Sequence, residues 1–289
     1  MSLIIRAAIA SGFCLFACVE AMAALVRPLP HAGFGQIPLT PVVVFGEEAR
    51  MTAQQYAERN HLDAGEVKRR HAASGVIHCG DARGAGQLTL TDSVITTAAH
   101  VLFDEQGRPR GDSAHCFFSA TVGGEEVTTA IDVGSVIAGS RAPYAGSAVH
   151  DWAVARLLQP IHGPTPYALG PHAQANQAVE FVARGHSDWG AGSVMSMEDC
   201  QLRGVLSAGA EGTRELSFDC DAGVGASGGA LLTASGNRLL AVFVGFRSVA
   251  PDQAMPFSAQ HYNFAVTLDG AFRQAVEAAA SGAANVSQR

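Results

Sequence analysis

The most informative stretch of this sequence is DAGVGASGG at residues 221–229. Glycines on both sides of Ser227 allow backbone conformations that are closed to other residues. The peptide N–H groups of Gly225 and Ser227 can therefore turn toward one point, where they would stabilise a developing negative charge as an oxyanion hole does. Taken alone, the same residues are equally consistent with a tight turn that happens to contain a serine.

Two motifs earlier in the chain favour a catalytic role for Ser227 over an incidental one. Residues 94–100, VITTAAH, predict a strand that runs into a small-residue turn ending in His100. Residues 149–155, VHDWAVA, place Asp151 directly before an apolar strand. Each motif alone is more typical of an ordinary turn or cap. Together with Ser227 they supply a base, an orienting carboxylate and a nucleophile, which are the parts needed for acyl transfer.

From residue 74 onward, short apolar runs alternate with Gly, Asp, Asn and Ser, which is typical of β-strands joined by turns. Such runs occur at 75–78, 87–90, 93–97, 127–131, 153–157, 178–182, 229–233 and 239–244. Their length and β-branched content predict an all-β sandwich or barrel. A C-terminal helix is expected over 270–280, capped by Asp269. Its buried face would consist of Phe272, Val276 and Ala279.

The N-terminal residues 1–23 have the organisation of a secretory signal peptide. They combine a positive charge at Arg6, an apolar run over 7–19 and a small-x-small cleavage pattern at 21–23. An alternative is a lipoprotein processing box ending at Cys18, which would then carry a lipid anchor. Both interpretations predict export to a secreted or periplasmic location, and no membrane association is expected after leader removal unless Cys18 is lipidated.

Residues 24–73 are predicted to form an N-terminal extension. Prolines and glycines over 27–41 prevent a continuous helix there and predict an extended linker. A helix is expected over Thr52–His71, with Thr52 as its N-cap and Gly65 as its only interruption. Its mostly polar face predicts a solvated or surface-docked helix, and the extension is a candidate pro-segment.

Composition excludes several functional classes. The 289 residues carry a formal net charge of -7, with 19 Lys plus Arg spread along the chain, so a nucleic-acid partner is not expected. Beyond the N-terminus, no apolar run is long enough for a multi-span membrane protein. The histidines lack paired ligand spacing, so a zinc site is not expected. Oligomeric state has no signal in the sequence.

Removal of the leader leaves an even number of cysteines, which are informative in an oxidising compartment. Four cysteines allow three disulfide connectivities, and four buried free thiols are the alternative. We expect Cys79 to pair with Cys116 and Cys200 with Cys220, because each pair brackets a loop next to one of the motifs above.

The three motifs resemble those of the trypsin-like serine proteases, which have the chymotrypsin fold. The blocks TAAH, DWAV and GASGG occur here in that family's order. The resemblance implies that Ser227 is the nucleophile, His100 the general base and then acid, and Asp151 the residue that orients the histidine. It implies Gly225 and Ser227 as oxyanion-hole donors, a polypeptide substrate, and a mechanism without a metal or cofactor.

The resemblance also implies a fold for residues 74–289. The family consists of two packed six-stranded antiparallel β-barrels, with the triad at their seam and a C-terminal helix over 270–280. The first barrel would span about 74–165 and the second about 175–267. The expected disulfides agree with this arrangement.

The chain departs from the animal digestive enzymes at one position. Ala226 stands where those enzymes place an aspartate that pairs with a new N-terminus after zymogen cleavage. The pattern around the Cys220-Asp221 pair is similar to that of secreted bacterial members near the glutamyl endopeptidase group. We therefore expect a preformed oxyanion turn that does not depend on one defined N-terminus.

Substrate preference is open at this stage. Asp221 occupies the slot that in trypsin forms the floor of the pocket for Arg or Lys, but bacterial relatives without this preference also have the Cys-Asp pair. Phe243 stands where glutamyl endopeptidases have a histidine, which disfavours glutamate. Phe243 and Phe246 would either narrow the substrate pocket or belong to the core.

Two rival interpretations remain. The stretch around Ser227 also fits the Gly-x-Ser-x-Gly elbow of an α/β-hydrolase, but that fold needs its aspartate and histidine after the serine. The other rival is a noncatalytic protease-like domain that binds a partner through its cleft.

Overall fold

The computed structural model describes residues 43–186, 189, 194–251 and 253–282. The predicted signal peptide, Cys18 and the proline-rich linker lie outside these residues. Within the described ranges, no helix is long and apolar enough to cross a membrane.

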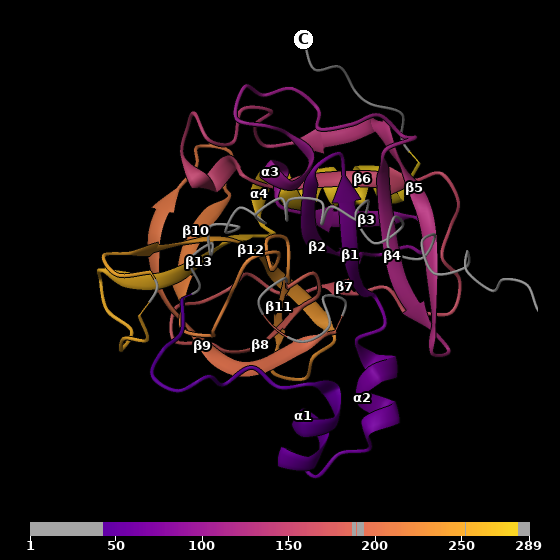
Figure 1. The fold of residues 1–289 in the computed structure, drawn as a ribbon. Helices are drawn as coiled ribbons and strands as arrows, with labels where there is room; N and C mark the ends of the chain where they lie inside the picture. Colours follow the sequence, from indigo (N-terminus) through magenta and orange to yellow (C-terminus); the bar gives the residue numbers. More distant parts are fainter. Residues whose placement is uncertain (1–42, 187–188, 190–193, 252, 283–289) are drawn as a thin grey trace, which may run out of the picture. The chain divides into compact units, whose positions relative to one another are not determined.

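The first barrel is closed by six antiparallel strands in the order β1-β2-β3-β6-β5-β4 (Figure 1). Fully buried Ile77, Ile95 and Phe118 belong to its core. The runs predicted at 75–78, 93–97, 127–131 and 153–157 lie within strands, to within one residue. The run predicted at 87–90 was wrong in its second half, because β2 ends at Leu88 and Leu90 has a left-handed φ of +62°. The strands are β1 (Ser74–Cys79), β2 (Ala82–Leu88), β3 (Val94–Thr97), β4 (Cys116–Val122), β5 (Glu125–Ala138) and β6 (Ala153–Leu157).

The second barrel has the strand order β11-β8-β9-β10-β13-β12 and is closed by pairing of β11 with β12. A short strand β7 (Ala168–Leu169) joins β12 in parallel at its edge. Phe181, Phe218 and Phe243 contact one another in this core, with ring centroids 5.4–5.8 Å apart. The barrel strands are β8 (Ala178–Ala183), β9 (Ser196–Ala208), β10 (Arg214–Phe218), β11 (Ala230–Thr233), β12 (Arg238–Ser248) and β13 (His261–Thr267).

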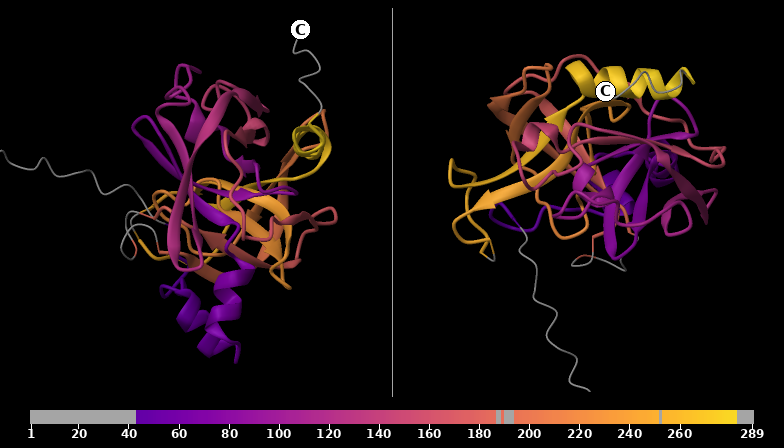
Figure 2. Two further views of the ribbon diagram at one scale, coloured as in Figure 1. Left: turned by 90° about the vertical axis from the view of Figure 1, so that its right-hand side faces the viewer. Right: turned by 90° about the horizontal axis from the view of Figure 1, so that it is seen from above.

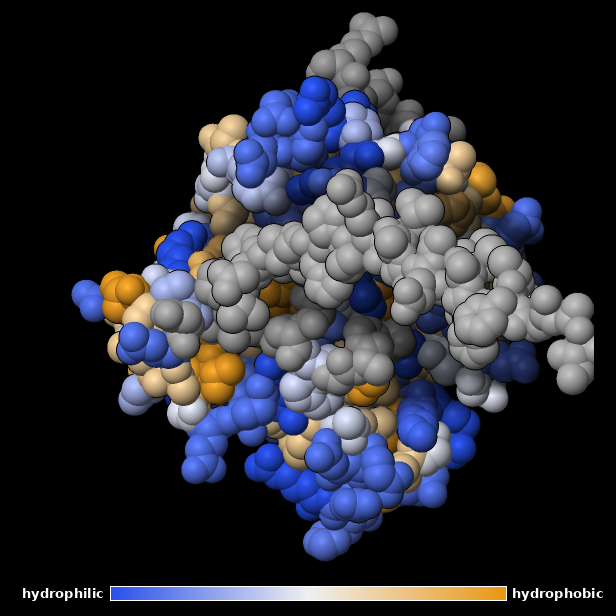
Figure 3. Space-filling model, in the orientation of Figure 1, coloured by the Kyte–Doolittle hydropathy of each residue, from blue (hydrophilic) through white to orange (hydrophobic). Residues whose placement is uncertain are grey.

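The N-terminal extension contains two short helices where one was predicted. Helix α1 (Ala53–Arg59) begins at the expected N-cap, Thr52, which forms a capping box with Gln55. The chain then turns through a left-handed residue, and α2 (Ala64–Arg70) begins after a new cap, Asp63. The break therefore precedes Gly65, which lies inside α2. Figure 3 shows that the visible face of these helices is mostly hydrophilic, as their sequence indicated.

The C-terminal helix α4 spans Gly270–Ala280, as predicted, and buries Phe272, Val276 and Ala279. Figure 2 shows it along the outside of the barrels. Phe272 stacks on Trp152 beside β6, with ring centroids 4.7 Å apart, which ties the helix to the first barrel. Asp269 occupies the N-cap position, but its side chain forms no cap bond and instead pairs with Arg214.

Both expected disulfides are present. Cys79 and Cys116 join the paired strands β1 and β4. Cys200 on β9 is joined to Cys220, which follows β10 and precedes the serine-containing turn. Each disulfide therefore fixes a segment next to one of the sequence motifs.

Candidate active site

His100 and Asp151 form a doubly bonded pair. Helix α3 (Ala99–Leu102) follows β3 directly, and the 3-10 helix η1 (Ala148–His150) ends just before Asp151. Asp151 Oδ2 lies 2.7 Å from His100 Nδ1, and its Oδ1 accepts the His100 backbone N–H at 2.9 Å. Because an ionised carboxylate can only accept, Nδ1 carries the proton in the neutral ring. The other ring nitrogen, Nε2, is then free to act as a base.

Ser227 lies in the turn between β10 and β11, which packs on the first barrel. Its carbonyl accepts the Ala85 N–H at 2.7 Å. Gly228 has a φ of +89°, and a Cβ at this residue would lie 2.2 Å from Thr97 Oγ1. Only glycine fits so closely against the end of β3. The structure thus brings the backbone of Ser227 to the strand that leads into His100.

Gly84 on β2 shows the same proximity. A Cβ at Gly84 would lie 2.6 Å from Val101 Cγ2 and 2.9 Å from the carbonyl oxygen of Ser227. Val101 follows His100 in the sequence. Gly84 therefore lies between the segment that contains His100 and the turn that contains Ser227, and only a residue without a side chain fits there. Within the described residues the Ser227 hydroxyl forms no hydrogen bond, so the structure contains no bond between Ser227 and His100.

The turn also provides unengaged backbone donors. The N–H groups of Ala226 and Gly228 donate to carbonyl oxygens at 3.1 and 2.7 Å. Those of Gly225 and Ser227 have no acceptor among the residues that the structure describes. Gly225 has a φ of +86°, and a Cβ there would lie 2.0 Å from the Gly185 carbonyl oxygen. The two predicted oxyanion donors are therefore available for a ligand.

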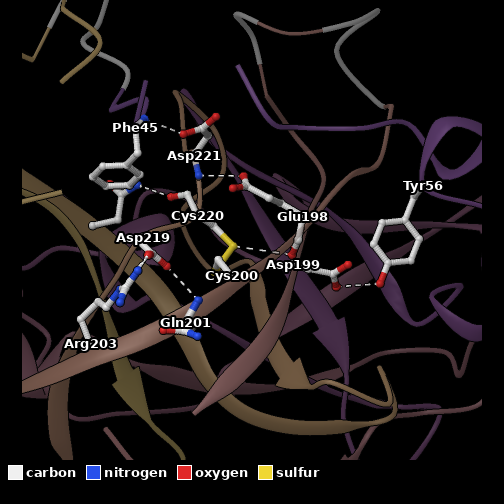
Figure 4. Close-up of a disulfide and its surroundings, with 11 residues drawn as sticks. Phe45, Tyr56, Glu198, Asp199, Cys200, Gln201, Arg203, Asp219, Cys220 and Asp221 are labelled. Atoms are coloured by element: carbon white, nitrogen blue, oxygen red, sulfur yellow. Dashed lines mark hydrogen bonds and ion pairs between the residues drawn. A yellow bond between two sulfur atoms is a disulfide. The ribbon is translucent and has the colours of Figure 1, made fainter. Parts of the chain in front are cut away.

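The predicted pocket residues have other surroundings. Phe243 is 3% exposed and belongs to the core of the second barrel, which is the second of the two roles considered for it. Phe246 is half-buried on β12, opposite Asn263. Asp221 is 1% exposed, and its two carboxylate oxygens accept the N–H groups of Phe45 and Ala49, both at 2.7 Å. Figure 4 shows the bond from Phe45. The Asp221 carboxylate is therefore not open to a substrate side chain in this structure.

A cavity next to the His100–Asp151 pair was missed by the sequence analysis. It has a volume of about 290 Å³. Tyr144 is half-exposed at its rim, with its ring centroid 5.9 Å from that of His100. The Arg247 guanidinium lies 4.3 Å from the Phe264 ring centroid and pairs with Glu215. The lining residues include His100, Tyr144, Asp151, Val244, Arg247 and Phe264.

The described residues contain no group of three or more side chains suited to holding a metal ion.

Glu198 is a buried acid near the base of the serine-containing turn. Its Oε2 accepts the Asp221 N–H at 2.8 Å. Burial and, secondarily, the charge of Asp221 raise the pKa of Glu198 to about 9. Burial also raises the pKa of Asp221, against the effect of its two backbone donors.

The raised pKa of Glu198 predicts a pH dependence of stability. The folded protein holds this proton to a higher pH than the unfolded chain, where the pKa is 4.5. The free energy of unfolding should therefore fall as pH rises between about 5 and 9, by up to about 1.4 kcal/mol per pH unit. Glu198→Gln cannot ionise but keeps a carbonyl acceptor, so it should flatten this decline.

Urea unfolding of both proteins at pH 5, 7 and 9 measures the difference, with the exposed helix variant Glu277→Gln as control. Parallel pH profiles for the wild type and Glu198→Gln would contradict the assignment of the decline to Glu198.

Two closed antiparallel barrels, a bonded histidine–aspartate pair and a glycine-flanked serine are typical of the class of chymotrypsin-fold serine proteases. Comparison of the sequence with protein families agrees, because the profile of the trypsin-like peptidase domain matches residues 73–242. The chain belongs to the trypsin-like peptidase family.

Solved structures show the same fold at low sequence identity. A Glu endopeptidase in complex with MPD has a TM-score of 0.61 and 13% identity, covering 83% of this chain and 100% of its own. The thermostable serine protease AL20 from an extremophilic microorganism has a TM-score of 0.52 and 14% identity, covering 74% of this chain and 99% of its own. Deg5 has a TM-score of 0.50 and 16% identity, covering 74% of this chain and 90% of its own. No curated protein matches the sequence.

Proposed function

We propose that this protein is a secreted serine endopeptidase that cleaves polypeptides through an acyl-enzyme intermediate. The observation that carries the proposal is the doubly bonded His100–Asp151 pair beside a serine turn with two unengaged backbone donors. Asp151 holds the His100 ring with Nδ1 protonated, so that Nε2 can accept a proton.

In the first half of the reaction, the Ser227 hydroxyl oxygen attacks the scissile carbonyl carbon while its proton passes to His100 Nε2. The carbonyl oxygen becomes negative and accepts the N–H groups of Gly225 and Ser227, which together would stabilise it by roughly 3 to 4 kcal/mol. The imidazolium then protonates the leaving amine as the peptide bond breaks. In the second half, a water oxygen attacks the acyl carbon while His100 Nε2 takes one of its protons. The bond between the acyl carbon and the Ser227 oxygen then breaks, and His100 returns the proton to that oxygen.

Export of the protein is part of this proposal. The two disulfides are typical of an oxidising compartment. They agree with the signal peptide predicted for residues 1–23, and mass spectrometry of the exported protein would identify its mature N-terminus.

A covalent probe separates the peptidase from its rival, a noncatalytic binding domain. Phenylmethylsulfonyl fluoride should add one sulfonyl group to Ser227 of the purified protein, detected by peptide mass mapping, because the probe needs a nucleophile activated by His100. A matched incubation of His100→Ala should leave Ser227 unmodified. Failure of the wild type to react, together with absence of casein cleavage, would favour a binding domain.

A further inference from the structure

Residues 43–51, here called the strap, run from the serine-containing turn to strand β9. At one end, Val43 and Ala222 exchange two backbone hydrogen bonds of 3.0 and 3.1 Å. At the other end, Met51 and Met197 exchange two of 3.0 and 2.9 Å. The strap is therefore bonded at both ends to the second barrel.

The strap curls around the carboxylate of Asp221. Phe45 and Ala49 donate their N–H groups to its two oxygens, and Gly46 between them has a φ of +88° that allows the tight turn. The backbone N–H of Asp221 donates in turn to Glu198. Asp221 is thus fixed from the strap side and from the barrel side, as Figure 4 shows.

Further contacts hold the middle of the strap on the barrel. The carbonyl of Val44 faces His261 Nε2 at 3.2 Å, and since a carbonyl can only accept, Nε2 is the donor. The ring of Phe45 packs edge-on against His261, with centroids 5.3 Å apart. The strap therefore contacts the barrel over residues 43–45 and again at 49–51, whereas residues 46–48 are exposed.

The serine-containing turn begins at the residues that the strap holds. Asp221 and Ala222 are followed after two residues by Gly225, the first oxyanion donor. Position 226 is a fully buried alanine, which has no charge with which to fix the turn. The start of this turn is held by the Cys200–Cys220 disulfide and by Asn263, which donates to the Cys220 carbonyl at 2.7 Å. At Asp221 and Ala222 themselves, the strap and Glu198 supply the hydrogen bonds.

We propose that Asp221 is a positioning residue whose carboxylate, by binding the strap, holds the oxyanion turn in its active conformation and does not recognise a charged substrate side chain. This inference rests on the proposed peptidase function. It predicts that loss of either strap bond lowers turnover equally for all substrates, because the oxyanion donors serve every scissile bond alike.

Two variants remove these bonds from opposite sides. Asp221→Asn leaves one acceptor for two N–H donors, and Ala49→Pro removes a donor without changing the turn itself. Each should lower kcat by at least about tenfold, by a similar factor for peptides with arginine, glutamate or leucine before the cleaved bond, with little change in KM. Glu47→Pro is the matched control, because the N–H of exposed Glu47 bonds no described residue, and its kcat should stay near that of the wild type.

The measurements are kcat and KM for the three peptides, the rate of labelling by phenylmethylsulfonyl fluoride, and circular dichroism to confirm folding. A rise in KM confined to the arginine peptide in Asp221→Asn would overturn the inference and assign Asp221 to the substrate pocket. Wild-type kcat in folded Ala49→Pro would also overturn it. A wild-type protein that neither cleaves nor reacts would instead refute the proposed function.

Discussion

Replacement of Ser227 by alanine is expected to lower kcat/KM for a peptide substrate by about 10⁴-fold or more while leaving the fold intact. Without the hydroxyl, no acyl-enzyme can form, and the remaining rate comes from binding and from the oxyanion donors. Because the half-buried side chain of Ser227 forms no hydrogen bond among the described residues, its truncation leaves no buried partner unsatisfied. Steady-state kinetics measure the loss of kcat/KM, and a thermal unfolding curve tests whether the fold stays intact.

Ser235→Ala is the matched control for this experiment. Ser235 is an exposed serine in the turn between β11 and β12, where it bonds Thr233 at 2.9 Å. Its replacement should change neither kcat/KM nor labelling by a sulfonyl fluoride. Comparable activity of Ser227→Ala and the wild type would show that another group is the nucleophile.

The parts of the site that could be predicted from sequence are those encoded by short motifs. His100 ends a strand and Asp151 begins one, and the family order of the motifs indicated that their side chains meet. The structure joins them by two hydrogen bonds. Small residues at positions 98 and 99, both fully buried, allow the close packing from which His100 projects.

The surroundings of Asp221 could not be predicted, because its partners are distant in sequence. Phe45 and Ala49 precede it by 176 and 172 residues and donate backbone groups that every residue except proline possesses. No pattern in the sequence marks such donors. Spacing to Ser227 left a place at the pocket floor open, whereas the structure shows the carboxylate buried and bonded to the strap.

Phe243 illustrates a limit of strand periodicity. Side chains on a strand alternate between two faces, but the pairing of β12 with β13 shifts between Phe243 and Gly245. Such a shift reverses the faces of all later residues relative to the earlier ones. Phe243 consequently belongs to the barrel core, while Arg247, which sequence gave no reason to select, borders the cavity beside His100.

Helix α2 shows the same limit at the level of local propensity. Gly65 has the low helix propensity that marks an interruption, yet it lies within the helix. The break occurs earlier, where Asp63 accepts the N–H of Glu66 and starts a new helix. The hydrogen bond from the Asp63 cap stabilises the start of α2 by more than the low helix propensity of Gly65 destabilises it.

Asp151→Asn tests the orienting role of the carboxylate and should lower kcat by about 10⁴-fold near neutral pH. The amide oxygen would remain bonded to the His100 backbone N–H, which needs an acceptor. The amide NH₂ group would then face Nδ1, where it can only donate. His100 would hold its proton on Nε2, and this nitrogen could no longer accept the proton of Ser227.

A second histidine–aspartate pair in the protein provides the control for that variant. His162 Nδ1 and Asp92 Oδ2 are also 2.7 Å apart, but both side chains are exposed and lie outside the residues that line the cavity. Asp92→Asn should therefore keep wild-type kcat, although it changes a bond of the same chemistry and length. Burst titration with a nitrophenyl ester would show whether Asp151→Asn slows acylation itself, as loss of the base requires. A normal burst rate in Asp151→Asn would refute the orienting role, because the tautomer of His100 would then not depend on this carboxylate.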